Sequence, residues 1–174
     1  MPRLYEDISS SALKHTAELM CAAARTAPKT RGRDLLLIGL LSPAEKDRVA
    51  AKMREIAERD GRPGCARDAG CIAAASQIVV IGAQREAVGL DCGFCGFKTC
   101  EGLKKAAGVC AFNSMDLGIA LGSAAALAAD LHADNRLMYS IGKAVLELGL
   151  LEGAVQAVGI PLTATGKNPF FDRK

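Results

Sequence analysis

The chain has no tryptophan, and its 174 residues include only five phenylalanines and two tyrosines. The apolar residues are mostly small and aliphatic, so the core must form by close approach of elements lined with Ala, Gly and Val, rather than around aromatic rings. Half of the residues are hydrophobic and 24% are charged, which is typical of a globular chain. From this length and composition we expect residues 1–174 to form a single domain.

The sequence also lacks the marks of secretion, of membrane insertion and of nucleic-acid binding. The N-terminal stretch MPRLYEDISSS has no apolar segment of a secretory signal. The longest run of small apolar residues, Leu117–Ala129, is too short to span a bilayer. The net charge of +3 is weak, and no basic stripe is interleaved with aromatic residues. We therefore expect a cytoplasmic protein with no membrane and no nucleic-acid partner.

Hydrophobic periodicity predicts alternating helices and strands. We expect helices over residues 8–26, 43–59 and 116–131 and between Asp134 and Gly149, and strands over residues 34–41, 77–83 and 154–162. Residues 64–75 fit either a short helix or a loop. The first two strands are continuous apolar runs, which predicts burial on both faces. This order of elements indicates an α/β or α+β fold with a small mixed sheet.

Two of the predicted helices have local features that bear on their packing. Ser42 and Glu45 have the spacing of a capping box at the start of the helix over residues 43–59. In the helix over residues 116–131, Gly118 and Gly122 lie on one face and permit close backbone contact. We expect that helix to be central and surrounded by other elements.

Four of the seven cysteines lie within the stretch DCGFCGFKTCEGLKKAAGVC, residues 91–110. They are Cys92, Cys95, Cys100 and Cys110, with the spacing C-x2-C-x4-C-x9-C. We expect this block to form a cofactor-binding insertion over residues 89–112, after the strand that ends near Ala83. In a reducing cytoplasm, clustered cysteines indicate metal ligands or catalytic thiols rather than disulfides.

Zinc, a redox-active thiol pair and an iron–sulfur cluster are the alternatives for this block. A thiol pair would use Cys92 and Cys95 and leave the other two cysteines without a role. Structural zinc sites usually have two C-x2–4-C pairs, and Cys100 and Cys110 do not form the second pair. An iron–sulfur cluster suits the pattern better, because its four thiolates surround a larger body and their loops are irregular.

The residues between the cysteines favour the same cofactor. Gly93 and Gly96 follow the first two cysteines, where glycine lets backbone N–H groups turn toward cluster sulfides. Phe94, Phe97 and Val109 would supply an apolar shell. Plant-type [2Fe–2S] ferredoxins use C-x4-C-x2-C, which is the reverse order, so the type of cluster stays open between [4Fe–4S] and [2Fe–2S] at this point.

The stretch CGFCGFKTC resembles the C-G-x-C-G-x-x-x-C signature of [4Fe–4S] domains in anaerobic electron-transport and corrinoid proteins, in which the fourth cysteine comes later. A closer resemblance is to the "ferredoxin domain-containing" family of anaerobic bacteria and archaea. The stretches that carry it are AARTAPKTRG, DCGFCGFKTC, DLGIALGSA, DNRLMYSIG and GIPLTATGKNPFFDR. They span residues 23–173, and the resemblance implies one [4Fe–4S] cluster.

A weaker resemblance is to the flavin-dependent nitroreductases, which have an A-x-x-A-P-S turn where this chain has AARTAPK. It implies a mixed sheet flanked by helices, a homodimer, and an FMN at the subunit interface. The chain lacks their Arg-Arg-Ser phosphate grip and has ISSSALK in its place. If FMN binds, we expect Lys29 or Arg31 to contact its phosphate in the basic turn that contains Gly32.

The remaining candidates have plainer interpretations. Cys21 is expected to be a buried structural thiol, and Cys65 and Cys71 form a C-x5-C pair too weak to predict a site. His15 and His132 are expected on the surface and at a helix end. Two further aromatics, Phe170 and Phe171, would either dock on a partner subunit or pack on the chain's own core.

Two functions follow from these expectations. The first is an oxidoreductase in which a cluster relays single electrons to an FMN. The second is a ferredoxin-like electron carrier or sensor with no substrate of its own; a zinc-stabilised interaction module is a third alternative. The sequence contains no P-loop, Ser/His/Asp triad or paired-carboxylate site that would favour another chemistry. The electron partner would be a redox protein or a small-molecule acceptor.

Overall fold

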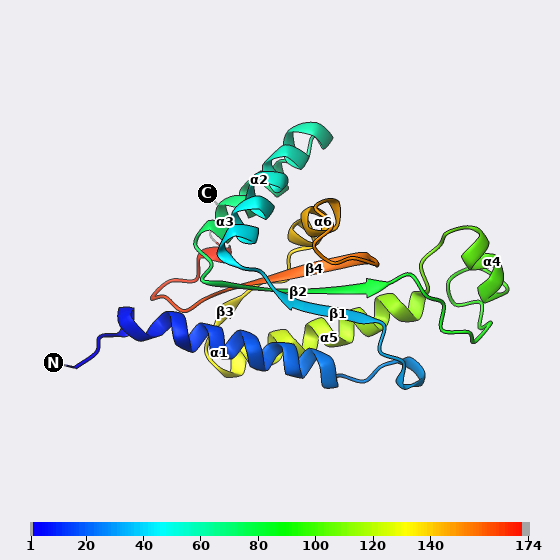
Figure 1. The fold of residues 1–174 in the computed structure, drawn as a ribbon, viewed down its shortest axis with the longest axis horizontal. Helices are drawn as coiled ribbons and strands as arrows, with labels where there is room; N and C mark the ends of the chain where they lie inside the picture. The colour runs from blue at the N-terminus through cyan, green and yellow to red at the C-terminus, as the bar shows by residue number, and fades with distance from the viewer. Residues whose placement is uncertain (1, 172–174) are drawn as a thin grey trace.

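A four-stranded sheet separates two layers of helices (Figure 1). In the computed structural model, which describes residues 2–171, the strands are β1 (Leu36–Leu40), β2 (Gln77–Gln84), β3 (Asp134–Asn135) and β4 (Ala154–Thr163). They lie in the order β1-β2-β4-β3. The fold therefore belongs to the α+β class, as the sequence predicted.

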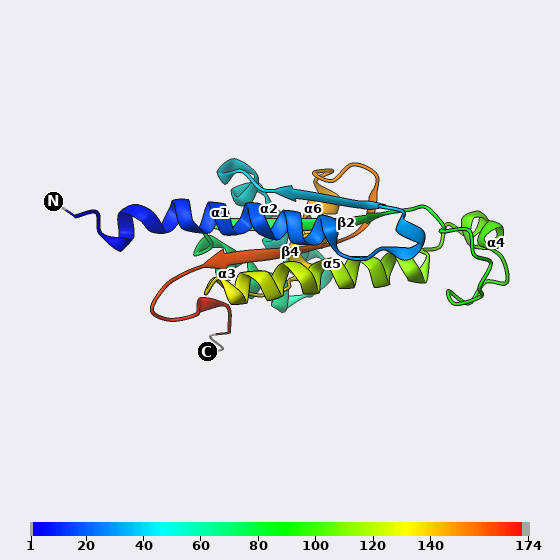
Figure 2. The ribbon, with the colours of Figure 1, turned by 90° about the horizontal axis from the view of Figure 1, so that it is seen from below.

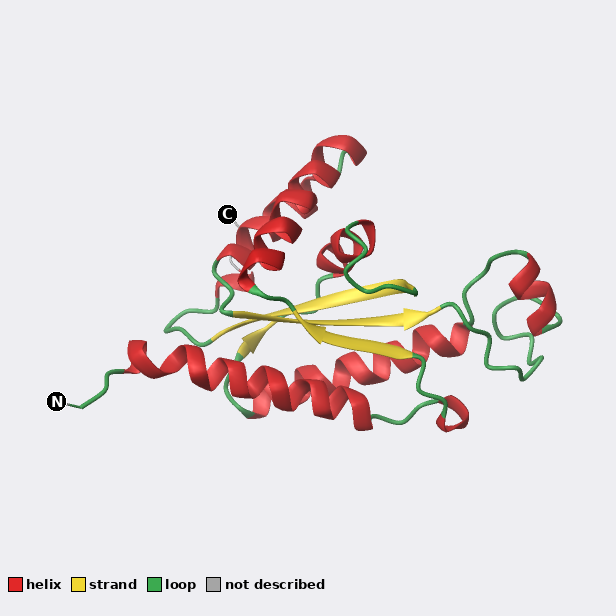
Figure 3. Ribbon diagram, in the orientation of Figure 1, coloured by secondary structure: helices red, strands yellow, loops and turns green. Residues whose placement is uncertain are grey.

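Two long helices cover one face of the sheet and three shorter ones cover the other (Figures 1 and 2). The first layer consists of α1 (Tyr5–Thr26) and α5 (Ala111–Asp130), which lie side by side. The second consists of α2 (Pro43–Asp60), α3 (Pro63–Ala73) and α6 (Tyr139–Glu147). Short 3₁₀ turns are η1 (Thr30–Gly32) and η2 (Pro169–Phe171). A further helix, α4 (Cys100–Lys105), lies beyond one end of the sheet (Figure 3).

The central strand β2 supplies apolar side chains to both layers. Val79 and Ile81 pack with α1 and α5, whereas Ile78 and Val80 pack with α2, α3 and α6. This alternation is the period of two that a strand imposes on its side chains. The core is assembled mainly from Ala, Val, Ile, Leu and Met, as the scarcity of aromatic residues predicted.

The expected mixture of strand directions is not found, because every strand pair in the described sheet is antiparallel. The reason lies in the connection between β1 and β2. The helices α2 and α3 form a hairpin that returns the chain to the end where β1 stops, and the N–H of Leu41 donates to the carbonyl of Ile78 at 3.1 Å. Since α3 covers the residues that the sequence left ambiguous, this reversal was not predicted.

Three other expectations need correction. The strand predicted over residues 34–41 is shorter, and most of β1 is only half-buried because it lies at an edge of the sheet. The residues expected to cap the helix before Gly149 form β3 instead, and α6 begins at Tyr139. The small-residue helix α5 is not surrounded, since Gly118, Ile119 and Gly122 are exposed.

Among the described helices, α5 is long and apolar enough, by length and composition, to cross a membrane. The core helix of a soluble protein passes the same test. In this fold α5 contributes Leu117, Leu121 and neighbouring alanines to the core that it shares with α1 and the sheet. Packing therefore explains the apolar residues on the buried side of this helix.

Candidate metal centre

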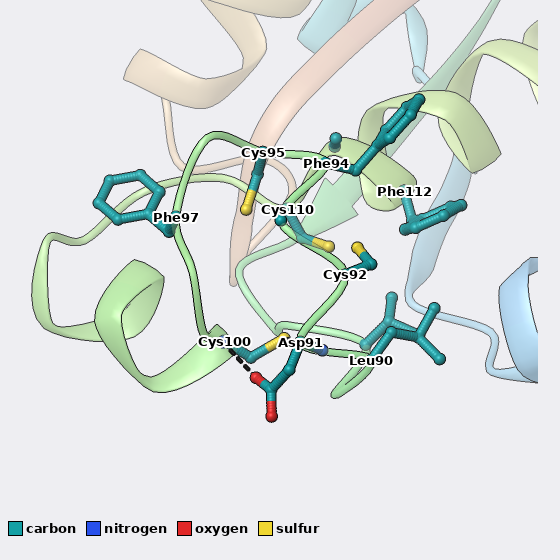
Figure 4. Close-up of a pocket in the computed structure, with 12 residues that line it drawn as sticks. Leu90, Asp91, Cys92, Phe94, Cys95, Phe97, Cys100, Cys110 and Phe112 are labelled. Carbon is teal, nitrogen blue, oxygen red and sulfur yellow. Dashed lines mark hydrogen bonds between the residues drawn. The ribbon is translucent and has the colours of Figure 1, made fainter.

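The segment between the end of β2 and the start of α5 projects from one end of the sheet and carries α4 (Figure 1). All four cysteines of the block line a single pocket in this segment: Cys92, Cys95, Cys100 and Cys110 (Figure 4). The range predicted for the insertion, residues 89–112, falls on this segment and on the first two residues of α5. The sequence-predicted ligands are thus brought together.

Glycine turns set the direction of the first two cysteines. Gly93 has a φ of 72° and Gly96 a φ of 85°, a left-handed region that glycine enters without steric cost. The N–H of Gly96 donates to the carbonyl of Gly93 at 2.9 Å and closes the turn. Each glycine directly follows a cysteine, and the turn that they bound contains Cys95 and begins one residue after Cys92.

The other two cysteines lie at the N-termini of helices. Cys100 is the first residue of α4, whose N-cap Thr99 accepts a hydrogen bond from the N–H of Gly102 at 3.1 Å. Cys110 is the N-cap residue of the 20-residue helix α5 and is only 7% exposed. The starts of two separate helices therefore hold the third and fourth cysteines of the block at the same pocket.

Asp91 joins the start of the block to its third cysteine. Its carboxylate accepts a hydrogen bond from the backbone N–H of Cys100 at 2.6 Å, and its own backbone N–H donates to the Cys100 Sγ at 3.4 Å (Figure 4). The sequence analysis did not single out this residue. The signal that could have found it is an aspartate next to the first cysteine, since Asp tolerates the φ of 46° found here.

The walls of the pocket are apolar. Phe94 and Phe112 stack with their ring centroids 5.7 Å apart, and Leu90, Val88 and Phe97 also line the site. The predicted shell included Phe94 and Phe97, but Phe112 takes the place expected for Val109, which does not line the pocket. Such a shell limits solvent access to a bound group and thereby affects its reduction potential.

The donor set consists of four free thiols in different degrees of exposure: Cys110 is buried, Cys95 and Cys100 are half-buried, and Cys92 is exposed. Within residues 2–171, no group of three or more His, Cys, Asp or Glu side chains is arranged to hold a metal ion. The thiols are instead distributed around the wall of the pocket (Figure 4). Four separate thiolate positions around an apolar space fit the chemistry of an iron–sulfur cluster.

The base of the projecting segment is held from two sides. From one side Arg31 donates to the carbonyls of Val88 and Gly89 at 3.4 and 3.3 Å. From the other side, the buried Asn113 donates to the carbonyls of Gln84 and Glu86 at 3.0 and 2.7 Å. Arg33 adds an ion pair with Glu86. These bonds fix the segment to η1 and α5.

The turn expected to contact a flavin phosphate therefore has other partners in this structure. The ammonium of Lys29 donates to the carbonyls of Ala24, Arg25 and Ala27 at 2.6–3.1 Å, which closes the C-terminal end of α1. Gly32 has a φ of 66° and allows the tight turn of η1. The flavin contact proposed for Lys29, Arg31 and Gly32 stays a prediction.

The remaining cysteines lie in the main body of the protein. Cys65 is buried and Cys71 half-buried among the apolar side chains of α2, α3 and α6. Cys21 is half-buried rather than fully buried, and burial is the main cause that raises the pKa of its thiol, with a smaller effect from Glu18. None of these three lines the pocket of the cysteine block.

Comparison with known proteins gives one close relative. An uncharacterized protein of Archaeoglobus fulgidus is 41% identical over 177 residues, which cover 97% of this chain and 95% of that protein. The family described as "Uncharacterized protein containing a ferredoxin domain (DUF2148)" matches residues 106–173. That range includes Cys110, α5, α6 and β4.

Solved structures of nitroreductases share the fold. The nitroreductase CinD from Lactococcus lactis has a TM-score of 0.61 at 12% identity, with 88% of this chain and 79% of that chain covered. A nitroreductase with bound FMN from Desulfitobacterium hafniense has a TM-score of 0.57 at 16% identity, with 96% and 80% covered.

The chain spans 59% of the hypothetical oxidoreductase YcnD from Bacillus subtilis, with 89% of its own length covered, at a TM-score of 0.58 and 15% identity. At such identities the likeness concerns the fold alone, and it confirms the nitroreductase-like arrangement predicted from the sequence. A ferredoxin domain is a redox module that carries an iron–sulfur cluster, which agrees with the four-thiol pocket. The chain belongs to the family of proteins that contain a ferredoxin domain, and it has a nitroreductase-like fold.

Proposed function

We propose that the protein is an iron–sulfur redox protein whose four clustered cysteines bind one [4Fe–4S] cluster. The observation that carries the proposal is the apolar pocket lined by Cys92, Cys95, Cys100 and Cys110. Left-handed glycines follow the first two of these cysteines, and the other two lie at the starts of α4 and α5, so four separate parts of the backbone present thiols to one pocket. When bound, the cluster would accept and release single electrons.

Zinc is less well supported by the arrangement of the ligands. A structural zinc ion requires four donors at about 2.0–2.3 Å from one point, usually from two paired knuckles. Here Cys100 and Cys110 come from the starts of two different helices with nine residues between them. Four thiols spaced around a pocket support the larger cluster.

Metal analysis of protein prepared without oxygen tests the proposal. We expect about four irons and four sulfides per chain. Replacing Cys100 or Cys110 with Ser should remove most of the iron, because each change takes away one of four ligands. The matched control is Cys65→Ser, which lies outside the pocket and should leave the iron content unchanged. Stoichiometric zinc without sulfide would contradict the assignment.

The protein is proposed to act as an oxidoreductase of anaerobic metabolism in the cytoplasm, with an electron carrier as the alternative. The oxidoreductase is favoured by the nitroreductase-like fold, which in the Desulfitobacterium hafniense protein binds FMN. An electron-carrier role would need the cluster alone. Whether FMN binds decides between the two roles.

Titration of FMN into cluster-loaded protein makes that decision. For the oxidoreductase we expect saturable binding that Arg31→Ala weakens by about 1.5–3 kcal/mol, the scale of a hydrogen bond to a charged group. Because Arg31 also holds the base of the projecting segment, iron content is measured on the same samples. Wild-type protein that shows no binding at high micromolar FMN would favour the electron carrier.

A further inference from the structure

Asp91 makes two hydrogen bonds to Cys100, one through its side chain and one through its backbone N–H. The carboxylate accepts from the Cys100 N–H at 2.6 Å, and the Asp91 N–H donates to the Cys100 Sγ at 3.4 Å. The pair closes a loop of ten residues that contains Cys92 and Cys95. Asp91 makes both hydrogen bonds while its backbone has a left-handed φ of 46°. We call these two hydrogen bonds the Asp91 clasp.

We propose that Asp91 is a positioning residue that raises the reduction potential of the group held by the four cysteines, by directing its own backbone N–H at the Cys100 sulfur. This proposal rests on the function proposed above. In this proposal Asp91 does not bind the metal group itself. Its carboxylate holds the backbone in place, and the backbone N–H acts on the sulfur.

The physical reason is the charge on the sulfur. When the bound group takes up one electron, negative charge increases on its thiolate ligands, and an N–H donor stabilises the reduced form more than the oxidised form. The exposed carboxylate acts in the opposite direction, because a nearby negative charge disfavours the added electron. Any test must therefore separate the hydrogen bond from the charge.

Two substitutions at this position make the separation. Asp91→Asn keeps an oxygen that accepts from the Cys100 N–H and suits a left-handed φ, whereas Asp91→Ala keeps neither. Both remove the same negative charge. The difference between the reduction potentials of the two variants therefore measures the effect of the Asp91 clasp without the effect of the charge. Glu101→Gln is the control, because it removes an exposed negative charge from the same segment.

The experiment is a potentiometric titration of iron-loaded protein, in which an electrode supplies one electron per cluster. We expect the Asp91→Ala potential to lie below that of Asp91→Asn by about 30–60 mV, the equivalent of a three- to tenfold change in the reduction equilibrium for one hydrogen bond. Deuterium exchange at the Asp91 amide should be slow in wild type and Asp91→Asn and faster in Asp91→Ala.

The outcomes separate this proposal from the one on which it rests. Equal potentials for the two variants, with full iron content, would overturn the role of Asp91 and leave the cluster in place. If Asp91→Ala loses iron, Asp91→Gly replaces it, because glycine adopts the same φ without the carboxylate; a potential equal to that of Asp91→Asn then overturns the proposal. Wild-type protein without iron and sulfide overturns both.

Discussion

Gly142 and Gly159 bring α6 and β4 into backbone contact. A Cβ atom on Gly142 would overlap the carbonyl of Ala157, and one on Gly159 would overlap the side chain of Ile141. The sequence predicted this kind of core, built by close approach of small residues, from the near absence of aromatics. It could not predict which glycines make the contact, because that depends on how α6 crosses the strand.

We predict that Gly142→Ala lowers the free energy of unfolding by about 1–3 kcal/mol or more, because α6 must move away from β4. Gly70→Ala is the matched control, since this helical glycine in α3 has open space around its Cβ direction. Alanine there should raise stability by up to about 1 kcal/mol. Urea unfolding measures both, and equal midpoints for the two variants would contradict the predicted contact.

In the candidate site, too, the sequence predicted residue types but not the contacts between residues that are distant in the chain. The cysteine spacing was sufficient to name the four thiols that line the pocket. The roles of Asp91 and Asn113 were not predicted, because they depend on hydrogen bonds between residues that the fold brings together. For Arg31, the sequence indicated a charged turn before a strand, but the carbonyls that it contacts are 57 and 58 residues away.

At the scale of helices and strands, the sequence predicted the start of a helix correctly where both residues of a capping box were present. Ser42 and Glu45 form the predicted capping box, and α2 begins at Pro43 and ends one residue beyond the expected position. The residues Asp134 and Asn135 also looked like a helix cap. They form β3 because their backbone pairs with Leu162 and Thr163 of β4, a long-range contact that local sequence does not reveal.

We predict that Ser42→Ala lowers the free energy of unfolding by about 1 kcal/mol, because the Ser42 hydroxyl accepts from the Glu45 N–H at 3.3 Å and donates to its carboxylate. Ser10→Ala, at an exposed position within α1, is the control and should have no comparable cost.

The effect of Ser42→Ala should depend on pH. Hydrogen bonds from the Ser42 N–H and hydroxyl lower the pKa of Glu45 below its usual value near 4.3. A carboxyl with a lowered folded pKa contributes stability above its unfolded pKa and loses it as the pH falls through the folded value. The Ser42→Ala variant keeps the N–H bond and loses the hydroxyl bond. The part of the stability gap between wild type and variant that comes from the hydroxyl bond to the carboxylate should therefore be fully present above about pH 5 and shrink below about pH 4. A gap that stays constant from pH 7 to 3 would contradict this coupling.

At the scale of the whole molecule, one exposed face of α5 carries apolar and small side chains. Met115 and Ile119 on α5 are each 45% exposed, and the exposed Gly118 and Gly122 lie on the same face of the helix. The two C-terminal aromatics differ in burial. Phe170 packs in the chain's own core, whereas Phe171 is exposed under the guanidinium of Arg136. Removal of the tail would thus cost stability as well as any contact with a partner.

We propose that the exposed face of α5 forms the interface of a homodimer, because its glycines allow a second helix to approach and its apolar side chains gain from burial. We predict that wild-type protein sediments as a dimer at micromolar concentration and that Ile119→Lys shifts it to monomer. Ala51→Lys, an equal change of charge at an exposed position of α2, should leave the dimer intact. Each protein is also checked for unfolding midpoint, so that loss of assembly is not confused with loss of fold. A wild-type monomer, or a dimer that tolerates Ile119→Lys, would place the interface elsewhere or remove it.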